Sequence, residues 1–379
     1  MREIDAIVAT YQKLKSDQVS CVLATVVHVQ GSSYRRAGAR MLVDEFGNLT
    51  GAISGGCLEG DALRKALHAL HQRKNKLVTY DTSDENDAII GAQLGCNGII
   101  KVLFEAIDFK NERNACELLQ IAIDNEEKAS IVVKFDLNEQ NFQAGTIALI
   151  YSEDAMHTSA EISEKVLSKA EEVIQNKQSD LIQLDNSNYS PIQFMQFYEP
   201  PVRLVLIGAG NDAMVLANQA ELLGWKIIIA DGRPSHANTQ RFTSGCHVIV
   251  TRPEEALQHV KIDERTCFAL MSHNYHYDLA VLKLLLTIKE VPYIGILGPL
   301  KKWQRMREDL ENEGIRISKE DEDRIHAPIG LELGAETPAE IGLSILAEIQ
   351  AVLTASSANF LKHKNSPIHK RTTSEILSL

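Results

Sequence analysis

A glycine turn that follows an apolar run is the feature that most constrains how this chain can fold. Residues 202–207 read VRLVLI, and Gly208, Gly210 and Ala213 follow with the spacing G-x-G-x-x-A. Such a run is typical of a buried strand. The glycines allow a tight turn, and backbone N–H groups at the start of the next helix can then approach a phosphate. The pattern predicts a strand, a turn and a helix up to Gly224; the alternative is that the glycines serve only the turn, without a ligand.

The rest of the second half continues this alternation of strands and helices. We expect further strands over residues 226–230, 246–250, 266–270 and 293–297, and helices near 254–259, 278–288 and 338–353. Alternation of this kind indicates a parallel sheet that helices cover on both faces. The expected fold class is therefore α/β, with a Rossmann-like, doubly wound parallel-sheet domain over residues 200–355.

Polar residues at the ends of two of these strands are candidate ligand residues. Asp231 ends the second strand, where an acid usually binds the ribose of NAD, and Arg233 could instead attract the 2′-phosphate of NADP. His273 follows the fourth strand and should lie near the same ligand. With His276 and Asp278 it could bind a metal, although Asp278 would more often cap the next helix. We expect NAD(P) or another nucleotide in this crevice.

Two adjacent prolines, Pro200 and Pro201, separate this half from a first domain over residues 1–199. The apolar spacing of that domain predicts an α+β structure whose strand order stays open. Its expected elements are helices near 4–14 and 58–72, strands near 20–29, 77–81 and 99–106, and a hairpin over 40–53. We expect no internal repeat of fixed period, and a loosely held tail over residues 356–379.

The predicted hairpin leads into a second glycine turn, formed by Ser54, Gly55, Gly56 and Cys57. Paired glycines between a strand and a helix predict a nest of backbone N–H donors that would hold an anionic group. A thiol at a helix start favours the thiolate form, which binds metal or carries sulfur. The alternative for Cys57 is a small cysteine at a tight packing point.

A second cysteine and three arginines extend this candidate site. Cys96 is also flanked by glycines, so Cys57 and Cys96 are the candidate metal ligands. Arg40, with Arg35 and Arg36, could hold a phosphate or a carboxylate, the alternative being a solvated loop. The other four cysteines lie in apolar segments or helices, and we expect them in the core.

The composition excludes several functional classes. The chain has 39 basic and 51 acidic residues, and its net charge of −12 argues against binding to nucleic acid or to anionic lipid. Six cysteines without a C-x-x-C pair fit a reducing cytoplasm. The sequence has no run of about 18 apolar residues, so we expect no membrane span.

Several strings together resemble the xanthine dehydrogenase accessory factor family of the XdhC/CoxI type. They are GSS at 31–33, GARM at 38–41, SGGCLEGD at 54–61, DGRP at 231–234, HNYHYD at 273–278, YIGILG at 293–298, HAPIGL at 326–331 and GAETP at 334–338. The resemblance extends over nearly the whole chain. Two strings depart from the family pattern: GCNG at 95–98 stands where GCGG is common, and DGRP replaces DPRP.

The resemblance implies a cytoplasmic chaperone rather than an enzyme with its own turnover. Such a factor binds molybdenum cofactor (molybdopterin) transiently and protects it while the terminal sulfido ligand is installed, with a cysteine desulfurase as the sulfur donor. It then delivers the cofactor to xanthine dehydrogenase or a related molybdenum hydroxylase. Assembly into a homo-oligomer is left open.

Two other interpretations stay open at this point. An NAD(P)-dependent oxidoreductase would use the second domain, with His273 or His276 as the acid or base. A scaffold protein would keep the dinucleotide-type fold without any ligand.

Overall fold

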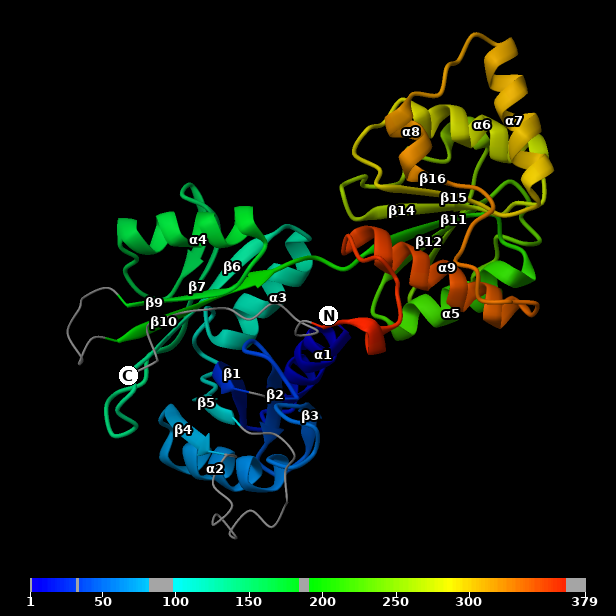
Figure 1. Ribbon diagram of the computed structural model, residues 1–379. Helices are drawn as coiled ribbons and strands as arrows, with labels where there is room; N and C mark the ends of the chain where they lie inside the picture. Colours follow the sequence, from blue (N-terminus) through cyan, green and yellow to red (C-terminus); the bar gives the residue numbers. More distant parts are fainter. Residues whose placement is uncertain (1, 32–33, 82–97, 184–190, 366–379) are drawn as a thin grey trace. The chain divides into compact units, whose positions relative to one another are not determined.

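The computed structural model describes residues 2–31, 34–81, 98–183 and 191–365. The chain divides into two compact units between Pro200 and Pro201, called unit one and unit two below (Figure 1). In the described part of the expected tail, residues 356–365 are exposed and contain only the 3-10 turn η3, Leu361–His363.

Unit one contains two antiparallel five-stranded sheets. Sheet A has the order β3-β2-β1-β5-β4, with β1 at Cys21–Gly31, β2 at Arg40–Asp44, β3 at Leu49–Gly51, β4 at Lys76–Asp81 and β5 at Gly98–Ala106. Sheet B has the order β8-β7-β6-β10-β9, with β6 at Ala129–Phe135, β7 at Gly145–Ser152, β8 at Ala155–Thr158, β9 at Asp180–Gln183 and β10 at Ile192–Tyr198.

The two sheets share one topology. In each, a helix precedes three antiparallel strands, a second helix follows, and two last strands pair on the other side of the first strand. The helices are α1 (Arg2–Ser16) and α2 (Glu59–Gln72) for sheet A, and α3 (Ala115–Asn125) and α4 (Glu164–Asn176) for sheet B. Unit one is thus a duplicated αβββαββ arrangement. The duplication is not visible in the sequence. The glycine and cysteine turn precedes α2, whereas the segment SAEIS at 159–163, which precedes α4, has neither glycine nor cysteine.

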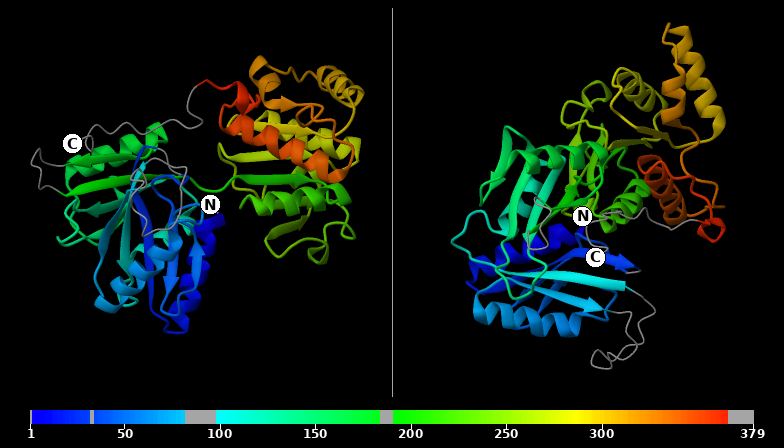
Figure 2. Two further views of the ribbon diagram at one scale, coloured as in Figure 1. Left: turned by 60° about the horizontal axis from the view of Figure 1, so that its bottom comes forward. Right: turned by 60° about the vertical axis from the view of Figure 1, so that its left-hand side comes forward.

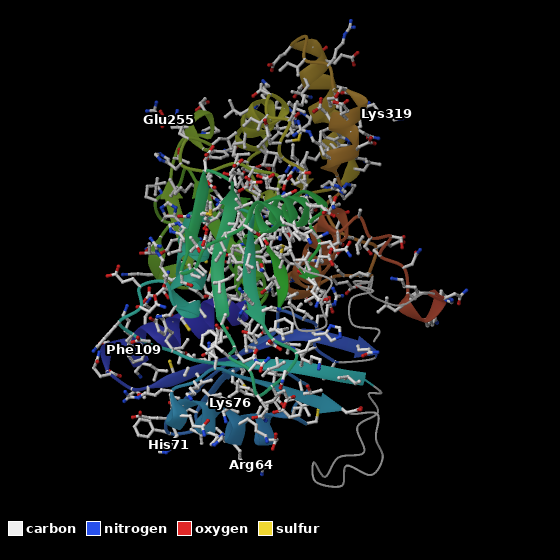
Figure 3. All side chains as sticks on the ribbon, turned by 90° about the vertical axis from the view of Figure 1, so that its left-hand side faces the viewer. Arg64, His71, Lys76, Phe109, Glu255 and Lys319 are labelled. Atoms are coloured by element: carbon white, nitrogen blue, oxygen red, sulfur yellow. The ribbon has the colours of Figure 1, made fainter. Side chains whose placement is uncertain are left out.

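Three hydrophobic layers hold unit one together. Alternate residues of β1 face opposite ways: Leu23 packs with α1 and α3 in a core shared by both sheets, whereas Val22 and Ala24 face α2. Helix α4 covers the outer face of sheet B (Figure 2). Polar side chains of α2 such as Arg64 and His71 point away from its sheet (Figure 3).

Unit two confirms the expected Rossmann-like domain. Its six parallel strands have the order β13-β12-β11-β14-β15-β16, at Arg203–Ile207 (β11), Lys226–Asp231 (β12), Cys246–Val250 (β13), Thr266–Leu270 (β14), Tyr293–Ile296 (β15) and Ile325–His326 (β16). Helices α5 (Asn211–Leu222) and α9 (Pro338–Leu353) cover one face, and α6 (Tyr275–Leu286) and α7 (Leu300–Asn312) the other (Figure 1). Since the strand order reverses between β11 and β14, a ligand crevice is expected at the carboxyl ends of these two strands.

One expected helix is wrong. Residues 254–259 form only the 3-10 turn η2 (Pro253–Glu255) and further turns. A helix of six residues gains few hydrogen bonds for the cost of starting it, and in this segment only Ala256 is fully buried. The helix α7, the short helix α8 (Lys319–Arg324) and the strand β16 were not expected from the sequence.

Candidate functional site

The turn between β3 and α2 is organised by the side chain of Ser54. Its hydroxyl accepts hydrogen bonds from the N–H groups of Gly56 at 3.2 Å and Leu58 at 3.1 Å, and it donates to the carboxylate of Glu59. The N–H of Ser54 donates to the same carboxylate at 2.8 Å. Burial opposes the charge of Glu59, but these hydrogen bonds outweigh it and hold the pKa of Glu59 below its usual value.

These contacts correct the expected anion nest. Ser54 is buried, and the donors of Gly56 and Leu58 already have an acceptor within the chain. A carboxylate also lies at the start of α2, where an incoming anion would meet a like charge. What stays open is the surface of Gly55 and Gly56, and a Cβ on Gly56 would meet no atom of the described residues within 4 Å.

Cys57 lies at the edge of this turn, half-buried. Its Sγ is 3.5 Å from Oγ of Ser54, and its side chain packs against the core beneath α2. Cys21 and Cys267 differ, because both are buried and burial raises the pKa of each thiol to about 12. Cys57, which is only partly buried, is therefore the cysteine that the turn offers to a ligand.

The other two described cysteines also differ in burial. Cys116 is buried as expected, whereas Cys246 is half-buried at the edge of the core of unit two, with its Sγ 3.3 Å from Oγ1 of Thr243. Cys96 lies outside the described residues. Within the part of the chain that is described, no three His, Cys, Asp or Glu side chains are grouped to hold a metal, and metal binding by Cys57 and Cys96 stays a prediction.

The structure also corrects Arg40. Its side chain is 1% exposed, and Nη1 donates to Oε1 of Gln196 on β10 at 2.5 Å. Alternation along β2 is the reason: Arg40 shares a face with Leu42, which belongs to the core between the two sheets. Arg35 is held by an ion pair with Glu3. The sequence suggested that these guanidinium groups are available to an anion at the glycine turn, but neither of the two is free.

Tyr34 is a neighbour of the turn that sequence reasoning missed. A Cβ built on Gly55 would lie 3.2 Å from Cγ and Cδ1 of the Tyr34 ring, so the ring rests on the glycine backbone. The side chain of Tyr34 is nevertheless 76% exposed. An aromatic residue directly after the GSS string was the only sequence signal.

In unit two, the two motif glycines have different roles. Gly208 has φ of 120°, and a Cβ there would lie 2.5 Å from the Cα of Ser272, so only glycine fits this close approach of two strand ends. Gly210 is the N-cap of α5, with φ of −69°. A Cβ on Gly210 would meet only the His273 ring, at 3.6 Å.

The acid at the end of β12 is already bound within the chain. Oδ2 of Asp231 accepts the Ala209 N–H at 2.8 Å and Nη2 of Arg233 at 2.7 Å, and Oδ1 accepts the Arg233 N–H at 2.8 Å and its Nε at 3.0 Å. Burial would raise the pKa of Asp231, but these donors lower it below its usual value. The expected role of Asp231 as a free acceptor for ribose is therefore corrected.

Two adjoining cavities open beside this ion pair and have Arg233 and His273 in common. The first, about 530 Å³, is lined by Asp231, Gly232, Arg233, Ser272, His273, Asn274, Tyr275 and Tyr277. The second, about 270 Å³, is lined by Gly210, Asn211, Asp212, Arg233, His236 and His273. The crevice that the strand order indicates is thus present, and four residues named from the sequence in unit two, Gly210, Asp231, Arg233 and His273, line it.

The alternative metal site near His273 is not formed. Asp278 is fully buried; Oδ1 accepts the Ser272 hydroxyl at 2.6 Å and Oδ2 accepts Nζ of Lys302 at 2.7 Å. The cap of α6 is Asn274, whose side chain accepts two N–H groups of the first turn. Asp278 therefore holds Ser272, a residue that lines the crevice, and is not itself among the lining residues.

Comparison with known proteins relates both units to one group of sequences. The sequence model of the XdhC and CoxI family matches residues 14–81, and that of the XdhC Rossmann domain matches residues 204–349. A protein of Bacillus subtilis (strain 168) described as a probable xanthine dehydrogenase subunit is 31% identical over 336 residues, 89% of this chain and 94% of that protein. The molybdenum cofactor insertion chaperone PaoD of Escherichia coli (strain K12) is 24% identical over 331 residues, 87% of this chain and 83% of that one.

A solved structure is similar to this chain over nearly its whole length. A crystal structure described as a xanthine dehydrogenase from Bacillus halodurans superposes with a TM-score of 0.73 at 29% sequence identity, covering 96% of this chain and 98% of that one. Among the described residues, the structure has no helix long and apolar enough to cross a membrane.

Proposed function

Because the chain belongs to the XdhC and CoxI family, as its motifs predicted, we propose that it is an accessory factor that carries molybdenum cofactor to a molybdenum enzyme. It binds the cofactor as cargo, keeps it while the terminal sulfido ligand is installed, and delivers it to xanthine dehydrogenase or a related molybdenum hydroxylase. A cysteine desulfurase supplies the sulfur, and the exchange takes place in the cytoplasm.

The observation that carries this proposal is the half-buried Cys57 in a turn with two exposed glycines. A thiol is a soft ligand suited to molybdenum or to sulfur chemistry, and here it lies beside backbone that a planar cargo can approach closely. The exposed ring of Tyr34, which rests on Gly55, offers a flat surface for a pterin.

The rival function, an NAD(P)-dependent oxidoreductase, has less support. His273 lines the crevice, but the carboxylate of Asp231 that would orient the ribose of NAD is bonded to Arg233. A hydride-transfer enzyme needs that orientation together with a placed acid or base.

A binding titration tests the proposal. Purified protein would be titrated with molybdopterin, metal-loaded and metal-free, and compared with Cys57→Ala and Cys246→Ala. Cys246 is the matched control, since it is also half-buried and also lies beside a hydroxyl. We expect tight binding by wild type and Cys246→Ala and weaker binding of the metal-loaded form by Cys57→Ala. Equal binding by all three proteins would remove Cys57 from the site, and no binding by wild type would refute the proposed function.

A further inference from the structure

The carboxylate of Asp231 has no acceptor site left for a ligand. An ionised carboxylate offers about four lone-pair positions, and four N–H donors from Ala209 and Arg233 converge on Asp231 at 2.7 to 3.0 Å. Its side chain is only 4% exposed. A ribose with two free hydroxyls would have to displace the guanidinium and leave a buried charge unpaired, which is costly.

Arg233, in contrast, retains capacity for an anion. Its Nε and Nη2 hold Asp231, and Nη2 also reaches the Ser272 carbonyl at 3.4 Å. Within the described residues, Nη1 makes no hydrogen bond, and the side chain is 45% exposed and lines both cavities. A guanidinium can bind a phosphate through one edge while the other edge keeps a carboxylate, because its five donors lie in one plane.

The surroundings of Arg233 add further donors for an anion. These are His273 and His236, which line the second cavity. The nearby guanidinium of Arg241 is not counted, because it already donates to Ala209, His236 and Asn211. One acid opposes them: Asp212, whose Oδ2 is 3.7 Å from Nε2 of His273.

We propose that the crevice of unit two binds a ligand through a phosphate group on Arg233, and that the Asp231–Arg233 pair excludes the free ribose diol of NAD. The phosphate occupies the position next to the end of β12, where dinucleotide folds that select a 2′-phosphorylated ribose also use an arginine. Recognition of this phosphate does not depend on unit one carrying molybdenum cofactor.

Calorimetric titrations of the full chain with four probes test this. The probes are NADP, 2′,5′-ADP, NAD and inorganic pyrophosphate. Wild type is expected to bind NADP and 2′,5′-ADP at least about tenfold more tightly than NAD, since a charge-assisted bidentate contact accounts for that much. Pyrophosphate bound with the same dependence on Arg233 would support the site for a smaller phosphate ligand.

Two variants separate the phosphate contact from general stability. Arg233→Gln should lose the preference for NADP over NAD. Asp231→Asn should keep the affinity for NADP, because the guanidinium remains without a competing charge. Arg307→Gln is the matched control, since Arg307 is 53% exposed, pairs with Glu322 and lines neither cavity. Equal affinity of wild type for NAD and NADP, an unchanged preference in Arg233→Gln, or no binding of any phosphate probe would overturn the proposal.

Discussion

The ring of Tyr34 lies on the backbone of Gly55, at the turn that also carries Cys57. The ring atoms are 3.2 Å from the position that a Gly55 Cβ would take, and 76% of the side chain remains exposed. One face of the ring is thus supported by the chain, and the side chain remains accessible to a flat ligand.

Replacing this ring should weaken the binding of a pterin. Tyr34→Ala is expected to raise the Kd for metal-free molybdopterin about tenfold, and Tyr34→Phe to leave it nearly unchanged, because stacking needs the ring and not the hydroxyl. Phe46→Ala is the control, since Phe46 is similarly exposed, at 72%, on the β2–β3 hairpin. Fluorescence titration of the pterin measures all three. An equal loss in Phe46→Ala would mean that the ring has no specific role.

The two motif glycines of unit two should differ in how much stability their replacement by alanine costs. Gly208→Ala forces a Cβ to within 2.5 Å of Ser272 at a positive φ, and we expect unit two to lose about 3 kcal/mol of unfolding free energy. Gly210→Ala, with ordinary φ and contacts, should change it by less than about 0.5 kcal/mol. Both tryptophans, Trp225 and Trp303, lie in unit two, so urea unfolding followed by tryptophan fluorescence reports this unit alone. Similar stability of the two variants would contradict the distinct roles of these glycines.

The stability of unit one should depend on pH through His28. Burial and, to a smaller extent, the charge of Lys101, its partner across the β1–β5 pair, together lower the pKa of His28 to about 4. The unfolded chain takes up a proton near pH 6.5 and the folded chain only near pH 4. The stabilisation is therefore complete above pH 6.5 and is lost as the pH falls to about 4, by up to about 3 kcal/mol.

Far-UV circular dichroism can follow that loss during urea unfolding. It also reports the unfolding of unit one, which has no tryptophan. In His28→Gln the change between pH 7 and pH 4.5 should be smaller than in wild type, since glutamine does not titrate. An identical pH dependence in both proteins would show that His28 is not its source.

The fold of unit two could be predicted from the sequence, whereas that of unit one could not. In unit two the apolar strands and helices alternate along the chain, and strand order then follows from a few connection rules. In unit one the pairing joins segments far apart in sequence, such as β1 with β5, and nothing in the local pattern specifies those partners. The duplicated topology was invisible for the same reason.

For the candidate site, too, local features could be predicted from the sequence and contacts between distant residues could not. The glycine turns and their helix starts were predicted correctly, because turn chemistry is local. Arg40 was misjudged because the face of β2 on which it lies is covered by a second sheet, and a pattern of alternation does not tell which face that is. The bond of Ser54 to Glu59 was missed because the spacing of five residues differs from the three of a capping box. The Asp231–Arg233 pair was likewise seen as two residues with alternative roles and not as one unit.

Activation of a client enzyme tests the central claim most directly. A molybdenum hydroxylase free of cofactor would be incubated with molybdenum cofactor and a cysteine desulfurase with its cysteine substrate, with and without this protein. We predict that wild type and Cys246→Ala raise the recovered hydroxylase activity several-fold and that Cys57→Ala does so much less, while none of them turns over NAD(P)H alone. Recovery that is the same without the protein, or steady nicotinamide turnover that needs no molybdenum cofactor and is abolished by His273→Ala, would contradict the account.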